Sequence, residues 1–176
     1  MLSKTIFFDY NATSPIHPDL KPKLVEWLDI WGNPSSIHAQ GRDAKKIVRE
    51  SRQALAEMLG VSPLELIFTS GGSEGNNTVI GGLLDSPLSL QRKELITTQI
   101  EHPSVARTID YAEQRGFVVH RIGVDRNGVF DFEHFEKVLS EKTLLVTMML
   151  ANNETGVILP ISKISKLCKE KQVLLH

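Results

Sequence analysis

The sequence predicts an α/β fold in which a mainly parallel sheet is covered by helices. Short apolar runs typical of strands alternate with amphipathic segments typical of helices, which is the pattern of parallel strands joined by helical crossovers. Glycine, proline, asparagine and aspartate separate these runs. A chain of 176 residues with 41% apolar and 23% charged residues is long enough to bury one core of ordinary globular composition.

The helical pattern begins near the N-terminus. Leu20, Leu24 and Leu28 recur every four residues and predict a first helix, which the turn sequence at residues 32–34 ends. A longer helix is predicted over residues 39–59, because its apolar side chains share one face and Gly60 follows. That face contains Ala44, Ile47, Val48, Ser51, Leu55, Met58 and Leu59.

A glycine-rich turn follows the first predicted strand, residues 66–68, and precedes a short predicted helix at residues 78–84. The turn offers small and hydroxyl-bearing residues: Ser70, Gly71, Gly72, Ser73 and Gly75. Free N–H groups at a helix start favour an anion, so the turn is interpreted as a phosphate-binding site. It matches neither the Walker motif nor G-x-G-x-x-G, and an ordinary strand-to-helix connection is the alternative.

The rest of the chain continues the alternation of strands and helices. Further strands are predicted at residues 95–98, 117–122, 144–150 and 173–176. Pro103 opens one helix, Asp131 caps another, and a third contains Ile161, Ile164 and Leu167. The last apolar strand lacks a covering helix after it, so the chain is expected to be incomplete at its C-terminus.

Polar side chains follow three of the predicted strands, at residues 70–74, 101–102 and 152–154. Because the carboxyl ends of parallel strands meet at one edge of a sheet, these clusters are expected to form a pocket. Each also has an ordinary explanation. In that case His102 does no more than cap its helix, Asn152 and Asn153 do no more than make turn hydrogen bonds, and Glu154 is a surface acid.

Charge and composition exclude several classes of function. The chain has 20 Lys and Arg against 21 Asp and Glu, without a basic cluster interleaved with aromatic residues, so no nucleic-acid surface is expected. No apolar run is long enough to cross a bilayer, and the N-terminus becomes acidic too soon for a signal peptide. A cytoplasmic protein with a small-molecule partner and no membrane partner is therefore expected.

The cysteine and histidine pattern argues against a disulfide framework and against a metal site. Cys168 is the only cysteine, and the six histidines do not fall at ligand spacing. Cys168 lies on the apolar face of its predicted helix beside Leu167, so a buried structural thiol is expected rather than a nucleophile.

Five motifs then occur in a fixed order along the chain. They are Phe8-Asp9-Tyr10-Asn11-Ala12-Thr13-Ser14-Pro15, Gly32-Asn33-Pro34-Ser35-Ser36-Ile37-His38 with Gly41, Phe68-Thr69-Ser70-Gly71-Gly72-Ser73-Glu74-Gly75-Asn76-Asn77, Glu101-His102-Pro103-Ser104-Val105, and Asn152-Asn153-Glu154-Thr155-Gly156. In this order the chain resembles the cysteine desulfurases of the NifS/IscS type. These belong to the class-V aminotransferase family of fold-type-I enzymes, which use pyridoxal 5'-phosphate. The loop Asn33-Pro34-Ser35 before the long helix is the part most specific for desulfurases.

The resemblance implies roles for matching residues. Gly72 and Ser73 stand where the family binds the phosphate of pyridoxal phosphate; the glycine departs from the family's alanine, and the serine keeps a hydroxyl. His102 matches the histidine that stacks on the pyridine ring and takes part in proton transfer. Asn153 matches the asparagine that hydrogen-bonds the 3-oxygen of the ring.

The resemblance also places five residues near the mouth of the active site, on the substrate side: Asn11, Ala12, Thr13, Asn33 and His38. For the fold it implies the three-layer α/β large domain of a transferase that depends on pyridoxal phosphate (PLP), and this domain is expected to be truncated here. Residues 1–14 would then belong with the small domain, and residues 15–176 would form the N-terminal part of the cofactor-binding large domain.

In the family L-cysteine is converted to L-alanine, and the sulfur remains as a persulfide on an enzyme cysteine for iron–sulfur clusters and tRNA thiolation. Sulfur-acceptor or scaffold proteins and a homodimer are implied as partners. The family's pyridine-nitrogen aspartate, Schiff-base lysine and persulfide cysteine match no residue here, so this chain alone is expected to be inactive. The alternatives are a selenocysteine lyase or aminotransferase of the same family, and a non-catalytic remnant or assembly module.

Overall fold

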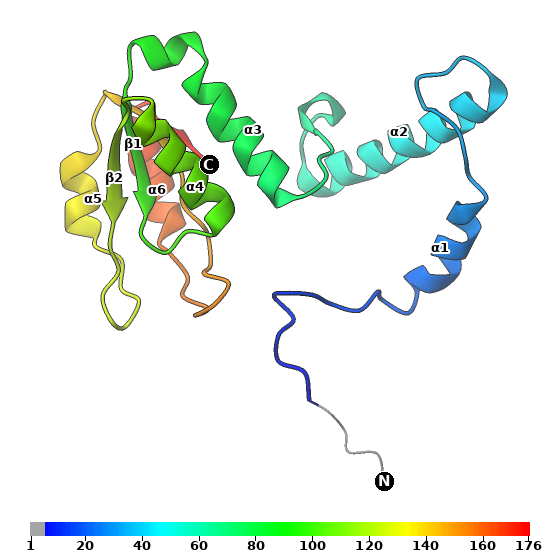
Figure 1. Cartoon of the computed structure of the whole chain (residues 1–176), viewed down its shortest axis with the longest axis horizontal. Helices are drawn as coiled ribbons and strands as arrows, with labels where there is room; N and C mark the ends of the chain where they lie inside the picture. The colour runs from blue at the N-terminus through cyan, green and yellow to red at the C-terminus, as the bar shows by residue number, and fades with distance from the viewer. Residues whose placement is uncertain (1–5) are drawn as a thin grey trace. The chain divides into compact units, whose positions relative to one another are not determined.

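The computed structural model describes residues 6–176, so residues 1–5 of the predicted N-terminal segment lie outside the described residues. The chain divides into two compact units, one that ends at Phe68 and one that covers Thr69–His176 (Figure 1). Among the described residues no helix is both long enough and apolar enough to span a membrane.

The first unit contains the helices α1 (Leu20–Leu28) and α2 (Ala39–Leu59) and the short 3-10 helix η1 (Pro63–Glu65). The bounds of α2 agree with the sequence prediction, and the physical reason is visible at both ends. Nδ1 of His38 accepts a hydrogen bond from the N–H of Gly41, and Gly60 ends the helix with a left-handed backbone at φ 67°.

Gly41 explains the spacing of the second motif, because the loop before α2 folds closely over its first turn. A Cβ atom on Gly41 would lie 2.5 Å from the carbonyl oxygen of Ser36 and 2.8 Å from that of Asn33. Only a residue without a side chain fits there. The apolar face of α2 is less covered: Leu55 and Met58 are 37% and 73% exposed.

The second unit contains a four-stranded parallel sheet in the order β2-β1-β3-β4. Its strands are β1 (Glu94–Thr98), β2 (Val118–Ile122), β3 (Thr143–Val146) and β4 (Leu174–Leu175). Its helices are α3 (Gly72–Leu84), α4 (Pro103–Gln114), α5 (Phe132–Val138) and α6 (Ile161–Glu170), with the 3-10 helix η2 (Pro87–Leu90) before β1.

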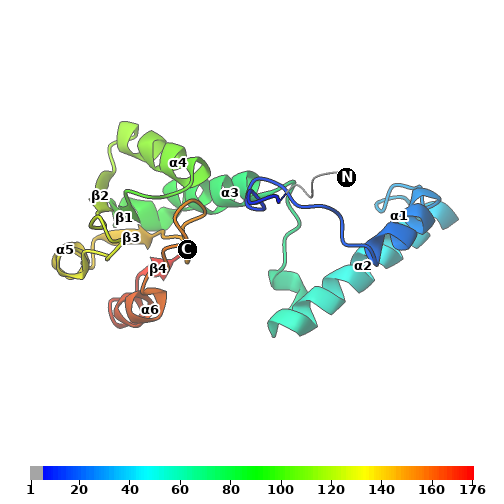
Figure 2. The ribbon, with the colours of Figure 1, turned by 90° about the horizontal axis from the view of Figure 1, so that it is seen from below.

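The sheet lies between two layers of helices, and each interface is a separate apolar core. Leu95 of β1 packs on one face with residues of α3 and α4, including Ile80 and Ile109. Ile96, the next residue of β1, packs on the other face with Phe135 of α5 and with α6. Figure 2 shows α4 on one side of the sheet and α5 and α6 on the other. The predicted three-layer α/β architecture with a parallel sheet is confirmed in this unit.

The structure corrects the first predicted strand. Residues 66–68 are extended but belong to no sheet, and Ile67 is 78% exposed. Their contacts are made by a side chain instead of a neighbouring strand, since Arg52 donates to the carbonyl of Leu66 and lies over the ring of Phe68. An apolar run predicts a strand only where a partner strand is present.

Two further predicted bounds were wrong. The helix predicted over residues 78–84 begins at Gly72, because local side-chain hydrogen bonds stabilise its glycine-rich first turns; Asn77 donates to the carbonyl of Ser73 and Thr78 to that of Glu74. The strand predicted over residues 144–150 ends at Val146. Beyond it, the N–H of Met149 donates to a side chain rather than to a strand.

Candidate active site

The strand order places a crevice between the carboxyl ends of β1 and β3. From β1 the chain passes through α4 to β2 on one side, and β3 then lies on the opposite side of β1. A reversal of strand order of this kind is the place where open α/β sheets bind ligands, beyond the carboxyl ends of the strands. His102 follows β1 and Asn153 follows β3, so both predicted residues lie at this edge.

The start of α3 provides an open helix N-terminus. Gly71 is the N-cap, Gly72 and Ser73 are the first two helical residues, and the first N–H groups of a helix have no acceptor within it. A Cβ atom on Gly71 or Gly72 would meet no atom within 4 Å, so the backbone there is open to an approaching group. This geometry and the helix dipole suit a bound phosphate group.

Glu74 lies in the first turn of α3 and reaches back to the turn before it. Its Oε2 accepts the N–H of Ser70 at 2.6 Å. Hydrogen bonds from the Ser70 side chain and backbone lower the pKa of Glu74 below its ordinary value. The ionised carboxylate therefore closes the turn at neutral pH.

Hydrogen bonds connect the start of α3 with the start of α4. Nδ2 of Asn76 donates to Oγ of Ser104 at 2.8 Å, and Oγ of Ser104 lies 2.8 Å from Nδ1 of His102. The hydroxyl of Thr108 donates to Oδ1 of Asn77 at 2.9 Å. The glycine turn and His102 are thus held together by a short chain of side chains within one unit.

The same hydrogen bonds define the state of the His102 ring. Nδ1 of His102 accepts the backbone N–H of Ser104 at 3.1 Å and so carries no hydrogen, and the hydroxyl of Ser104 therefore donates to the same nitrogen while it accepts from Asn76. With Nδ1 as acceptor, the neutral ring carries its proton on Nε2. His102 does cap its helix, as the ordinary alternative supposed, and it is exposed at this edge.

His102 lines two cavities. One of about 270 Å³ is lined by Asn76, Glu101, His102, Val105, Thr147, Met148, Met149 and His176. The other, of about 310 Å³, is lined by Gln99, Ile100, Glu101, His102, Pro103, Asn152, Asn153, Glu154 and Thr155. His102 and Asn153 therefore share a cavity, and Glu101 and His102 line both.

Asn152, the neighbour of Asn153, organises the loop after β3. It is 9% exposed. Its Nδ2 donates to the carbonyl of Ile100 at 2.9 Å, and its Oδ1 accepts the N–H groups of Glu154 at 3.0 Å and Thr155 at 2.8 Å. The turn hydrogen bonds expected of this asparagine are present, and the bond to Ile100 reaches across to the loop that carries His102.

The structure assigns the predicted site residues to different units. Gly72, Ser73, His102 and Asn153 all belong to the unit Thr69–His176. The five residues predicted on the substrate side belong to the first unit and are exposed: Asn11, Ala12, Thr13, Asn33 and His38. Within it, the N–H groups of Ala12 and Thr13 donate to the carbonyl of Asp9, and Oδ1 of Asn33 accepts from Ser35.

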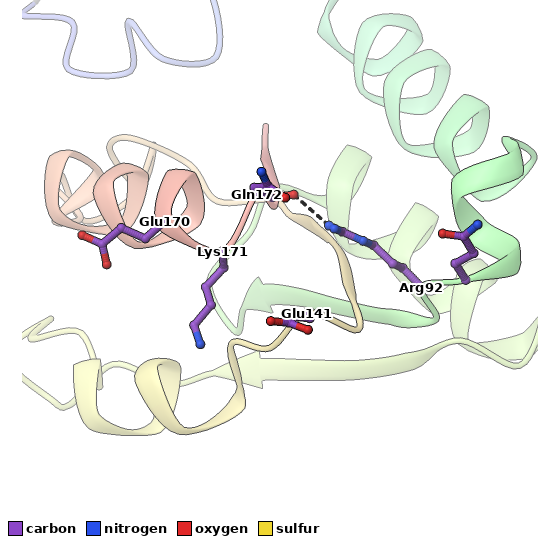
Figure 3. A pocket seen from close by; sticks show the side chains of 6 residues that line it. Arg92, Glu141, Glu170, Lys171 and Gln172 are labelled. Carbon is purple, nitrogen blue, oxygen red and sulfur yellow. Dashed lines mark hydrogen bonds between the residues drawn. The ribbon is translucent and has the colours of Figure 1, made fainter.

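A cavity of about 580 Å³ lies at the opposite edge of the sheet, where the strands begin (Figure 3). Nη1 of Arg92 donates to the carbonyl oxygens of Gln172 at 2.8 Å and Thr143 at 3.3 Å. Its guanidinium therefore ties together the segments that enter β1, β3 and β4. This edge is fastened by Arg92, and the predicted site residues lie at the other edge.

The family profile described as aminotransferase class-V matches residues 6–176. The chain therefore belongs to the class-V aminotransferase family. It is 40% identical over 173 residues to a cysteine desulfurase of Nostoc sp., and the match covers 97% of this chain and 42% of that protein. The chain thus spans less than half the length of this curated relative.

Solved structures agree with this assignment. A NifS-like protein superposes with a TM-score of 0.90 at 35% identity, over 96% of this chain and 47% of the other. SspA in complex with cysteine superposes with a TM-score of 0.89 at 32% identity, over 98% of this chain and 50% of the other. The predicted fold and the predicted family are both confirmed.

Proposed function

We propose that this chain supplies one wall of the active site of a cysteine desulfurase that uses pyridoxal phosphate and L-cysteine. The observation that carries the proposal is the crevice between β1 and β3, where His102 and Asn153 line one cavity and the open start of α3 is linked to His102. Similarity to cysteine desulfurases, and to a structure described as a complex with cysteine, supports the choice of substrate.

Each side chain has a defined task in this proposal. The N–H groups at Gly72 and Ser73, with the serine hydroxyl, hold the phosphate. His102 would hold the ring from one face and could move a proton at its Nε2, since Nδ1 is engaged by Ser104. Asn153 would hold the oxygen of the ring. When bound, pyridoxal phosphate supplies the electron sink that substrate activation needs.

The proposed reaction balances as L-cysteine plus a thiol giving L-alanine plus a persulfide. The carbon–sulfur bond of the substrate breaks, and the sulfur joins an acceptor thiol. Cys168 is not that thiol, because it is 1% exposed and burial raises its pKa to about 11. We assign the acceptor cysteine, the lysine that tethers the cofactor and the aspartate at its ring nitrogen to polypeptide other than these 176 residues, so the chain alone has no turnover.

The proposal also covers the domain organisation, the substrate side of the site and the oligomeric state. Residues 1–14 belong with a small domain and residues 15–176 with the cofactor-binding large domain. Asn11, Ala12, Thr13, Asn33 and His38 line the substrate side, and the active form is a cytoplasmic homodimer that passes sulfur to an acceptor or scaffold protein. Sedimentation of the complete gene product tests the dimer, and a monomer under conditions of full activity would contradict it.

The activity is tested on the complete gene product, incubated with pyridoxal phosphate, L-cysteine and a thiol. We expect L-alanine and persulfide sulfur in equal amounts. Transfer of the amino group to a keto acid, or turnover of selenocysteine alone, would assign the protein to another branch of the family. Residues 1–176 expressed alone should show no turnover, and turnover by them would contradict the proposal.

The phosphate site is tested with Ser73→Ala and a matched control. Loss of one hydroxyl that hydrogen-bonds a charged group should weaken pyridoxal phosphate binding about tenfold or more. Ser162 occupies the second position of α6, as Ser73 does in α3, and is exposed. Ser162→Ala should leave cofactor binding unchanged. Equal effects of the two substitutions would remove Ser73 from the site.

A further inference from the structure

Glu101 is the residue beside His102 that touches both loops of the crevice. Its Oε1 accepts a hydrogen bond from the hydroxyl of Thr98 at 2.7 Å and from the backbone N–H of Met149 at 3.0 Å. Thr98 ends β1 and is 3% exposed, whereas Met149 lies beyond the end of β3. One carboxylate oxygen therefore joins the ends of two neighbouring strands.

This carboxylate works with a second tie three residues farther along the β3 loop. Nδ2 of Asn152 donates to the carbonyl of Ile100 at 2.9 Å, and the N–H of Ile100 donates to the hydroxyl of Thr98 at 3.3 Å. The segment before His102 is thus fixed at successive residues. His102 follows directly, with its backbone held as the N-cap of α4.

We infer that Glu101 is a positioning residue that holds His102 and Asn153 at the spacing the reaction needs. This inference rests on the proposed function. Glu101 is not assigned contact with the reacting atoms; its side chain is directed to Thr98 and Met149, and it acts through the two loops it joins. Two donors from neighbouring strand ends share this one side-chain oxygen, so both loops are fixed at a single atom.

The test uses Glu101→Ala, Glu101→Gln and Thr98→Val in the complete gene product. Alanine removes both hydrogen bonds of Glu101, and glutamine keeps an oxygen that accepts them. Valine at position 98 keeps the shape but removes the donor to Glu101 and the acceptor for the N–H of Ile100. We expect Glu101→Ala to weaken pyridoxal phosphate binding at least tenfold and to lower kcat more than it changes KM. Glu101→Gln should stay within about threefold of the wild type, and Thr98→Val should fall between.

A second measurement does not depend on the cofactor. Amide hydrogen exchange at Met149 in the cofactor-free protein should be at least fivefold faster in Glu101→Ala and near wild type in Glu101→Gln, because only alanine frees this N–H. Glu141 is an exposed carboxylate at the opposite sheet edge, and Glu141→Ala should change neither Met149 exchange nor cofactor binding.

Several results would overturn the inference. Cofactor binding and Met149 exchange within twofold of the wild type in Glu101→Ala would show that the tie is not used. Equal losses in Glu101→Gln and Glu101→Ala would show that charge, not the hydrogen-bonded tie, matters. If the wild type binds no pyridoxal phosphate, the proposed function fails. Met149 exchange then still decides whether Glu101 fastens the loops.

Discussion

Replacement of Asn152 by alanine should loosen the loop that presents Asn153. The side chain of Asn152 makes four hydrogen bonds to main-chain and hydroxyl groups: to the carbonyl of Ile100, and from the N–H of Glu154, the N–H of Thr155 and the hydroxyl of Thr155. At about 1 kcal/mol each, these bonds would total about 4 kcal/mol. Glu154 and Thr155 are exposed and can bond water instead, so a loss of about 2 kcal/mol is expected.

The prediction is checked by urea unfolding followed by far-UV circular dichroism, and by amide exchange at Thr155. Exchange there should be about fivefold faster in Asn152→Ala, since one hydrogen bond of about 1 kcal/mol is lost. Asn152→Asp keeps the accepting oxygen and loses the donor to Ile100, so its stability should fall between those of the wild type and Asn152→Ala.

Asn127 provides the control, because it is exposed in the turn before Gly128. Asn127→Ala should change the free energy of unfolding by less than about 0.5 kcal/mol. The reasoning is refuted if Asn152→Ala costs no more than this control, or if its Thr155 amide exchanges as slowly as in the wild type.

Three further predictions concern single side chains. Cys168 should not react with Ellman's reagent in the folded protein at pH 8 and should react after unfolding, and fast labelling of the folded protein would contradict this. Burial raises the pKa of Cys168 to about 11, so its contribution to stability is complete below the unfolded pKa near 9 and is lost as the pH rises toward 11. Thr97→Val should raise the free energy of unfolding by about 1 kcal/mol, since the Thr97 hydroxyl is buried and no partner for it exists among residues 6–176. If the free energy measured by urea unfolding falls instead, a bound water satisfies this hydroxyl. Glu74 has a lowered pKa, so the stability that it gives to the start of α3 is present above its unfolded pKa and is lost as the pH falls through the folded pKa. Glu74→Gln should flatten the acid dependence of amide exchange at Ser70, and an unchanged pH profile would contradict this.

The sequence predicts local structure well where the signals are local. The 39–59 helix is bounded by His38 as its N-cap and Gly60 as its C-cap, and both directly adjoin the segment that they bound. The strand predicted at residues 66–68 does not form, because a strand depends on a partner elsewhere in the chain. The sequence does not predict the start of α3 at Gly72, because glycine and asparagine have low helix propensity. Hydrogen bonds from the side chains of Asn77 and Thr78 offset this low propensity.

The candidate site shows the same division. Alternating strands and helices predict that residues after β1 and β3 share an edge, and His102 and Asn153 do line one cavity. The tie between Glu101 and Met149 joins residues 48 positions apart in the chain. A single sequence has no local pattern that pairs such residues, so the role of Glu101 appears only in three dimensions.

Arg92 and Glu101 fasten the same pair of strands at opposite ends. A slip of β3 along β1 by one side-chain repeat would move it by about 6.6 Å and would break both ties at once. The separation between the loops that follow the two strands is therefore fixed. A ligand held across this span must match its length, so differences in ligand size would be accommodated by the side chains of the two loops and not by the separation of the loops.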